Sequence, residues 1–336
     1  MKISADGGAL CIKGNFHFGN YTFTQGLIEA IGKYDTKNEY TVYSFCKKPD
    51  WLKIKKKLHY KILKPAVFWL STRVSIEEMS HRKDIFLALN QAIPFSTKSK
   101  IISFSHGLSF YFYQQFYPDS YLVLKDLLEP MTKRSKFIVV PSRRVKTEMS
   151  KLFPKYKNFK ILNYGIPDDM AVFSPVKRKK FFLFVGMNHR IKNINFIVKV
   201  FKEFKENNRR KDYKLFLVGN LQDFEDKENG VFVFSDINRE AIRKLYSEAA
   251  AYLTASYYES FNFPVLEALA QNCPVIGLEG AVIPEFTKFV STVENNKDFM
   301  QKMVDVSQGR IKMKQRDELF KRFSWKKYVT KLKELY

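Results

Sequence analysis

Short apolar runs alternate with helical patterns along the first half of the chain. The runs that indicate strands are residues 39–45, 57–63, 84–89, 100–105, 136–142 and 159–163. Between them, apolar positions recur at helical spacing in residues 21–33, 121–134 and 143–152. Continuous apolar strands separated by helices are typical of a parallel sheet covered on both faces, so the first half predicts an α/β domain.

A turn at residues 164–167 and a linker-like stretch at 171–180 lead into a second α/β series. Its expected elements are strands at 180–186, 213–219, 231–235, 251–256 and 274–278, and helices at 193–204 and 239–249. We therefore predict two facing Rossmann-like domains, residues 1–165 and 166–323, with a C-terminal helix of about 324–336 packing back on the first. Ligands of such sheets bind beyond the carboxyl ends of the strands, so we expect the site in the cleft between the domains.

Length and charge narrow the function classes only in part. With 336 residues, of which 45% are apolar, the chain can form two domains with a core each. The formal net charge of +24 admits a nucleic-acid-binding face, a face for anionic lipid, or a lysine-rich surface without a partner. Basic residues occur along the entire chain, which favours the last interpretation, and we expect no specific nucleic acid.

Cysteine usage is sparse. Cys11, Cys46 and Cys273 form an odd set without a metal-binding spacing, which predicts a reducing compartment, no disulfide framework and no structural zinc. No signal peptide is evident, and every apolar run is far shorter than the roughly 18 residues of a membrane span. We therefore expect a cytoplasmic protein.

The segment at residues 259–275 carries the candidate chemistry. After the expected strand at 251–256, a loop leads to Pro264, which suits the first residue of a helix. Asn272 suits a left-handed cap, and Pro274 prevents the helix from continuing. Glu259 in the loop and Glu267 in the first helical turn would then lie beside free backbone N–H groups, where an anion can bind. Carboxylates accept hydrogen bonds from sugar hydroxyls, although two Glu at this spacing are more often ordinary surface charge.

With its context, the segment resembles a known family. ESFNFPVLEALA is similar to the E-x7-E motif of the family 4 glycosyltransferases, which have the GT-B fold. Further matches follow the family's order at residues 18–22, 102–108, 137–142, 163–166, 185–186 with 192–193, and 322–325. Each match alone is weak, but their joint order favours the resemblance over nearly the whole chain.

The resemblance implies roles for individual residues. Glu259 would contact the hydroxyls of the donor sugar, and Glu267 would bind the ribose of the nucleotide. Lys192 and Arg190 would hold the diphosphate, while His106 would lie near the transferred sugar and the acceptor. The resemblance implies further donor contacts. They come from Gly19 of the N-terminal loop, which would let the backbone approach the phosphates closely, from Gly186 of the phosphate segment, and from Ser260, Phe261 and Asn262 of the E-x7-E loop.

Several positions depart from the family pattern. Ser260 and Asn262 stand where the family often has glycine, and both side chains restrict the loop's conformation. Ile191 separates Arg190 from Lys192, whereas the family has adjacent Arg and Lys. Gly107 replaces the Asp that commonly follows the histidine. These departures leave the identity of the donor open.

The implied reaction transfers a hexose-type sugar from a nucleotide-diphosphate sugar to a hydroxyl of a glycan, glycolipid or similar lipid-linked acceptor. The family retains the anomeric configuration, with the departing phosphate accepting the acceptor's proton. No Asp-x-Asp occurs in the chain, and no metal or other cofactor is expected, because cationic side chains can stabilise the leaving diphosphate. Two alternatives remain open: a GT-B relative that hydrolyses, epimerises or phosphorolyses, and an inactive basic scaffold that binds membrane or nucleic acid.

A second feature is the basic stretch at residues 47–64. It holds eight lysines together with Trp51, His59 and Tyr60, against the single acid Asp50. Such a stretch suits peripheral attachment to an anionic membrane or capture of an anionic acceptor. A solvated rim beside the strand at 57–63 is the plainer interpretation.

Overall fold

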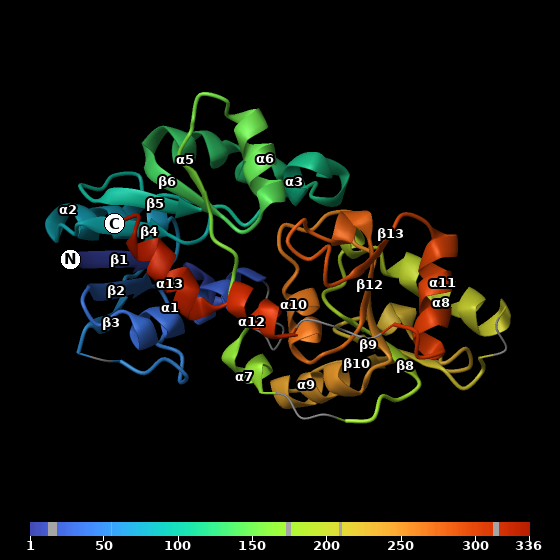
Figure 1. Ribbon diagram of the computed structural model, residues 1–336. Helices are drawn as coiled ribbons and strands as arrows, with labels where there is room; N and C mark the ends of the chain where they lie inside the picture. Colours follow the sequence, from blue (N-terminus) through green and yellow to red (C-terminus); the bar gives the residue numbers. More distant parts are fainter. Residues whose placement is uncertain (13–18, 55, 173–175, 208–209, 312–315) are drawn as a thin grey trace. The chain divides into compact units, whose positions relative to one another are not determined.

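The structure is a computed structural model, and it describes residues 1–12, 19–54, 56–172, 176–207, 210–311 and 316–336 (Figure 1). Gly14 and Phe18 of the expected N-terminal loop, Lys55 of the basic stretch and residues 173–175 of the expected linker lie outside this part. The chain divides into two compact units. One comprises Met1–Gly165 with Ser324–Tyr336, and the other comprises Ile166–Phe323.

The first unit is built on a seven-stranded parallel sheet of order β3-β2-β1-β4-β5-β6-β7. Its strands are β1 (Lys2–Asp6), β2 (Glu39–Ser44), β3 (Leu58–Ile62), β4 (Ile85–Ala88), β5 (Lys100–Phe104), β6 (Ser135–Val140) and β7 (Phe159–Ile161). The apolar pattern missed β1, which is an interior strand of the sheet. Ser4 and Asp6 interrupt its apolar run, yet both are buried, because Ser4 donates to Glu78 and Asp6 accepts from the Gly8 N–H.

The helices of this unit include the C-terminal one, which returns to it. They are α1 (Gly19–Tyr34), α2 (Ser75–Ser80), α3 (Ser109–Phe112), α4 (Tyr121–Asp126), α5 (Leu128–Arg134), α6 (Arg143–Leu152) and α13 (Trp325–Lys333). The expected helix at 121–134 is thus two helices that meet at Leu127. Trp325 packs so closely on Gly26 of α1 and on Gly165 that neither glycine has room for a Cβ atom.

The second unit holds a six-stranded parallel sheet of order β10-β9-β8-β11-β12-β13. Its strands are β8 (Phe181–Val185), β9 (Lys214–Val218), β10 (Val231–Phe234), β11 (Ala251–Thr254), β12 (Val275–Leu278) and β13 (Ser291–Val293). Its helices are α7 (Asp168–Ala171), α8 (Ile194–Asn207), α9 (Arg239–Glu248), α10 (Phe263–Ala270), α11 (Asn296–Ser307) and α12 (Arg316–Arg322). The pattern missed the short β13 and the helices α11 and α12.

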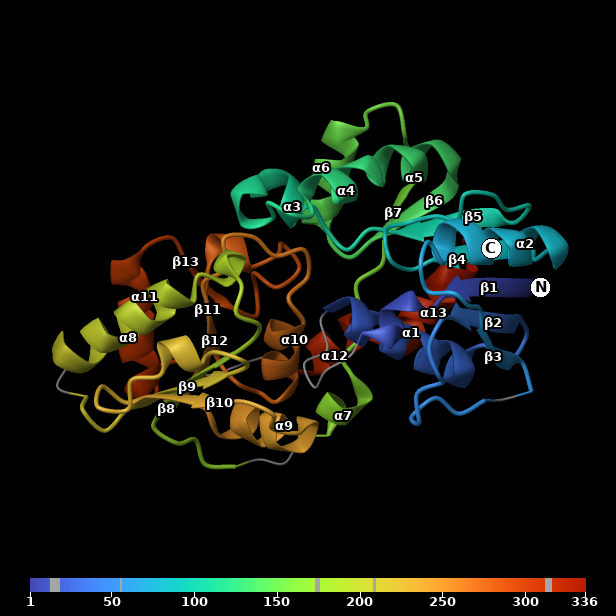
Figure 2. The ribbon, with the colours of Figure 1, turned by 180° about the vertical axis from the view of Figure 1, so that it is seen from behind.

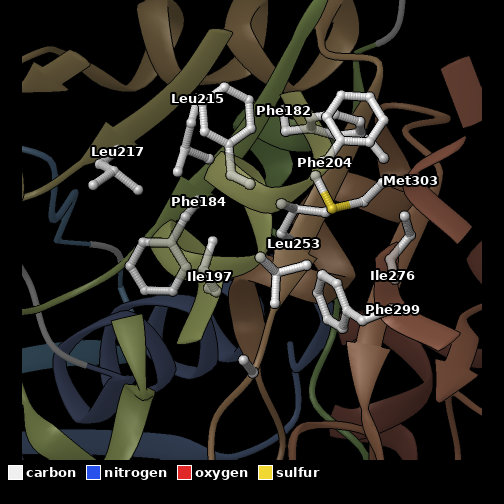
Figure 3. Packing of buried hydrophobic residues seen from close by; sticks show 14 of the residues in the cluster. Phe182, Phe184, Ile197, Phe204, Leu215, Leu217, Leu253, Ile276, Phe299 and Met303 are labelled. Carbon is white, nitrogen blue, oxygen red and sulfur yellow. The ribbon is translucent and has the colours of Figure 1, made fainter. Parts of the chain in front are cut away.

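Aromatic packing dominates the core of the second unit (Figure 3). The rings of Phe182 and Phe204 meet edge to face with centroids 5.3 Å apart. Helices α8 and α11 lie side by side, where Phe196 packs on Phe299 at 5.4 Å (Figure 2). Within the run at residues 181–184, Phe182 and Phe184 belong to this core, whereas Phe181 stacks on Phe216 with centroids 4.3 Å apart.

The expectation of no disulfide is wrong. Cys11 and Cys46 form one, with Cα atoms 5.5 Å apart. They follow β1 and β2, which pair in parallel with Asp6 opposite Tyr43, so the two chain segments leave the sheet at the same edge. Cys273 is a free, buried thiol, and burial raises its pKa to about 11. In the part of the chain that the structure covers, no helix is long and apolar enough to cross a membrane.

Candidate functional site

The loop between β11 and α10 places the E-x7-E segment at the carboxyl edge of the second sheet. The helix begins at Phe263, so Pro264 is its second residue rather than its first. Glu267 is the fifth helical residue and therefore lies beyond the first turn. The sequence had predicted it within the first turn. The left-handed conformation expected of Asn272 is present, with φ 57°.

Asn262 holds the loop through both ends of its amide group. Its Oδ1 accepts from the Val265 N–H at 3.4 Å and so caps α10, while its Nδ2 donates to Thr254 and to the Ala281 carbonyl at 3.3 and 3.2 Å. Its φ is 71°, in the left-handed region that asparagine tolerates better than most side chains. Asn262 stands where the family often has glycine, and its backbone is nevertheless left-handed.

Lys192 and Glu259 meet although they are far apart in the sequence. The Lys192 Nζ lies 2.7 Å from the Glu259 Oε1, which also accepts from the Ser256 hydroxyl at 2.7 Å. The segments that carry them are joined by the Tyr257 N–H, which donates to the Ile191 carbonyl at 2.9 Å. Glu259 is only 8% exposed. The arrangement places a cation and a hydroxyl acceptor together beside the start of α10.

Glu267 is held by a residue that the sequence did not single out. Arg239, at the start of α9, donates to the Glu267 Oε1 at 2.8 Å and to the Asp169 carboxylate at 2.7 Å, and the Tyr246 hydroxyl donates to the Glu267 Oε2 at 3.3 Å. Burial by itself would lower the pKa of Arg239, but the charges of Glu267 and Asp169 outweigh it and raise that pKa. No motif pointed to Arg239, because its partners come from other segments.

Two glycines let the ends of β8 and β9 approach. Gly186 follows β8, and a Cβ atom there would lie 2.9 Å from the Phe184 ring. Gly219 follows β9 with φ 146°, and its Cβ atom would overlap the Gly186 carbonyl oxygen. Only Gly186 was expected at the site. The requirement at Gly219 arises from the neighbouring strand, which the sequence around it does not reveal.

The remaining donor candidates of this unit differ in exposure. The Arg190 side chain is exposed, and Ser260 is half-buried. Phe261 is buried, with its ring centroid 5.5 Å from that of Phe286 and 6.0 Å from that of Phe323. Its side chain therefore belongs to the core and is not directed at a ligand.

The candidates of the first unit lie in different settings. The ring nitrogens of His106 are 2.6 Å from the Leu89 carbonyl oxygen and 2.8 Å from the Tyr164 hydroxyl. Burial lowers the pKa of His106 to about 4. The imidazole is thus neutral near pH 7, with Nε2–H donating to Leu89 and Nδ1 accepting from Tyr164. Gly19 is the exposed first residue of α1.

The basic stretch at 47–64 is partly engaged in the fold. Trp51 donates to the Tyr21 hydroxyl at 3.0 Å. Three lysines bind acceptors nearby: Lys48 the Leu52 carbonyl, Lys57 the Thr36 carbonyl, and Lys61 the Glu77 carboxylate. These contacts agree with a folded rim beside β3.

Comparison with known proteins identifies the second unit. Residues 166–323 match the model of the family described as glycosyl transferases group 1. Residues 166–323 are a group 1 glycosyltransferase domain. The chain is also 27% identical over 218 residues to the O-antigen chain mannosyltransferase RfbU of Salmonella typhimurium. That match covers 62% of this chain and 59% of the relative's length. The resemblance inferred from the motifs is confirmed.

Solved structures share the fold of the whole chain. The sucrose-phosphate synthase of Thermosynechococcus elongatus has a TM-score of 0.77 at 16% identity, covering 100% of this chain and 98% of that one. WaaG, a glycosyltransferase involved in lipopolysaccharide biosynthesis, has a TM-score of 0.68 at 14% identity, covering 99% and 95%. HepE of Anabaena, in complex with UDP-glucose, has a TM-score of 0.71 at 13% identity, covering 99% and 98%. The expected GT-B class, two Rossmann-like domains with parallel sheets, is confirmed.

Proposed function

We propose that the chain is a retaining glycosyltransferase that moves a hexose-type sugar from a nucleotide-diphosphate sugar to a hydroxyl of a glycan, a glycolipid or a similar acceptor. The observation that carries the proposal is the partly buried Lys192–Glu259 pair in a group 1 domain, at the start of α10. The similarity to a mannosyltransferase and to a protein in complex with UDP-glucose supports a nucleotide-sugar donor.

In the proposed donor complex, Lys192 and the exposed Arg190 neutralise the diphosphate. The Lys192 Nζ carries several N–H donors, so it can bind a phosphate oxygen while it remains on Glu259. Glu259 accepts hydrogen bonds from the sugar's hydroxyls with its remaining lone pairs. Glu267, oriented by Arg239, accepts from the ribose hydroxyls. The backbone of residues 260–262 and Gly186 complete the site.

The chemistry follows from where charge develops. Cleavage of the sugar–phosphate bond builds negative charge on the leaving phosphate, and each preorganised cation in a dry site contributes a few kcal/mol to its stabilisation. We propose that Lys192 and Arg190 supply this stabilisation without a metal ion, and that the departing phosphate accepts the acceptor's proton on the same face. Retention of anomeric configuration is the expected stereochemical result.

We propose that the first domain binds the acceptor and that Gly19 and His106 take part. The neutral His106 already uses both ring nitrogens, on Leu89 and Tyr164, so it would contact the acceptor through its ring rather than by a hydrogen bond or by charge. A lipid-linked acceptor would bring the enzyme to the cytoplasmic face of an anionic membrane. The basic stretch at 47–64 would then add electrostatic attraction.

The test is a thermal-shift screen of nucleotides and nucleotide sugars, followed by product analysis. At least one nucleotide sugar should stabilise the wild type, and Lys192→Ala and Glu259→Ala should abolish that shift. Lys202→Ala is a matched control, because Lys202 pairs with Asp226 at 2.6 Å on the same unit. Failure of every compound to stabilise the wild type would sink the proposal and favour the inactive scaffold. Free sugar as the only product would favour the hydrolase alternative.

A further inference from the structure

A group of large apolar side chains is exposed on the first unit. They lie on the segment from the cis peptide Lys64–Pro65 through the π-helix η2 (Leu70–Val74) and α2, and on the loop after β4. We call them the apolar patch: Val67, Phe68, Ile76, Met79 and Phe95, which are 68%, 77%, 55%, 41% and 81% exposed. Clustered exposed apolar residues on this scale mark interaction sites.

Hydrogen bonds join the two segments of the patch. The Ser96 N–H donates to the Ser75 Oγ at 3.0 Å, and the Ser96 hydroxyl donates to the Met79 sulfur at 3.4 Å. Phe95 therefore lies beside α2, which carries Ile76 and Met79. Phe95, Ile76 and Met79 therefore lie on neighbouring segments, and Val67 and Phe68 precede η2 on the segment that continues into α2.

The opposite side of the same segment is firmly attached to the core. Val74 is fully buried in the cluster that also contains Trp69 and Phe86. Glu78 is buried as well, and it accepts hydrogen bonds from Ser4 and Ser99 at 2.6 Å each. Because α2 is fixed in this orientation, its apolar outer side chains cannot turn inward. The apolar patch is therefore a built surface.

The surroundings of the patch are basic. Residues 61–100 contain seven Lys or Arg side chains and three carboxylates, which gives a net charge of +4. Two of these carboxylates are engaged internally, since Glu77 pairs with Lys61 and Glu78 is buried. Lys64, Arg82 and Lys98 are exposed. Apolar side chains with a basic rim match the boundary between the headgroups and acyl chains of an anionic bilayer.

We propose that the apolar patch docks the protein on an anionic phospholipid membrane. Phe68, Ile76 and Phe95 enter the interface, while the basic rim contacts lipid phosphates. A second copy of the chain is a poorer occupant, because each chain carries a net charge of +24 and the facing surfaces would repel. The docking stands apart from the proposed activity; only its purpose, access to a lipid-linked acceptor, rests on that activity.

The test is flotation of the full chain with vesicles of phosphatidylcholine, with or without about a third of phosphatidylglycerol. The patch variant is Ile76→Ser with Phe95→Ser. The matched control is Leu122→Ser with Val123→Ser, since these α4 side chains are 66% and 64% exposed outside the patch. The wild type and the control should float with anionic vesicles, and the patch variant should bind at least about tenfold more weakly.

Three results of the flotation assay would overturn the proposal. The patch variant could float like the wild type, the wild type could bind neutral and anionic vesicles equally, or it could bind neither. A concentration-dependent dimer in sedimentation, lost in the patch variant alone, would assign the surface to a second copy instead. All variants are also measured for stabilisation by the donor, which the patch substitutions should leave unchanged, so failure of docking and failure of the proposed activity are separate outcomes.

Discussion

Removal of the Lys192 charge by Lys192→Met should reduce stability and donor binding together. The Nζ–Oε1 distance is 2.7 Å, and the two side chains are 21% and 10% exposed. At an effective dielectric constant of about 20, the direct attraction at that distance is roughly 6 kcal/mol, and desolvation of both groups offsets most of it. The variant leaves Glu259 largely buried without this cation, which we expect to cost about 3 kcal/mol.

A double-mutant cycle separates the pair from its surroundings. We expect Glu259→Gln alone to cost about 2 kcal/mol, and the double variant about 3, because it leaves no unpaired charge. The coupling energy is then about 2 kcal/mol, which corresponds to roughly 4–8 °C in the Tm of a domain of this size. The Lys202–Asp226 pair, at 39% and 27% exposure, should show a coupling below about 1 kcal/mol.

The measurements are thermal unfolding of the full chain and calorimetric titration with the nucleotide sugar found in the screen. The double variant should be about as stable as Lys192→Met alone, rather than showing the sum of the two losses, and should still fail to bind the donor. A coupling energy near zero would refute the electrostatic reasoning. A double variant that binds the donor as tightly as the wild type would show that the pair is structural and does not belong to a donor site.

Three further predictions concern other residues. Arg239→Gln should weaken donor binding about tenfold by releasing Glu267, with Arg239→Lys intermediate in the same titration; equal affinity in all three proteins would refute the positioning role. Gly219→Ala should lower the free energy of unfolding by about 3 kcal/mol or more, and the Tm with it, since a Cβ atom there meets the Gly186 carbonyl; an unchanged melting curve would contradict the geometry. The contribution of neutral His106 to stability should be complete above its unfolded pKa of 6.5 and should be lost as the pH falls toward about 4. A His106→Gln variant whose free energy of unfolding falls with pH as steeply as that of the wild type would refute this.

The local pattern predicted most strands but missed β1. Its residues Ser4 and Asp6 are polar, and burial raises the pKa of Asp6 in spite of its hydrogen bonds to Gly8 and Asn90. The partners of these two side chains are brought by β4, α2 and the Gly-rich turn. A pattern of apolar positions cannot identify a strand whose polar residues are satisfied by distant groups.

The same limit explains why the sequence did not predict the disulfide. The spacing of Cys11 and Cys46 carries no recognisable motif, so the sequence suggested free thiols. The parallel pairing of β1 and β2 brings the two residues to one edge of the sheet, with Cα atoms 5.5 Å apart. The pairing of strands is a property of the whole sheet rather than of either segment.

At residues 259–275, the sequence by itself determined the loop, the helix and the left-handed Asn272, because capping and proline geometry are local. Only the tertiary structure decided which polar groups meet there: Lys192 on Glu259, and Arg239 on Glu267. The physical reason is that parallel strands are joined by crossovers, so their carboxyl ends gather residues far apart in the chain. Backbone conformation follows from neighbouring residues, whereas electrostatic pairing follows from the order of strands in the sheet.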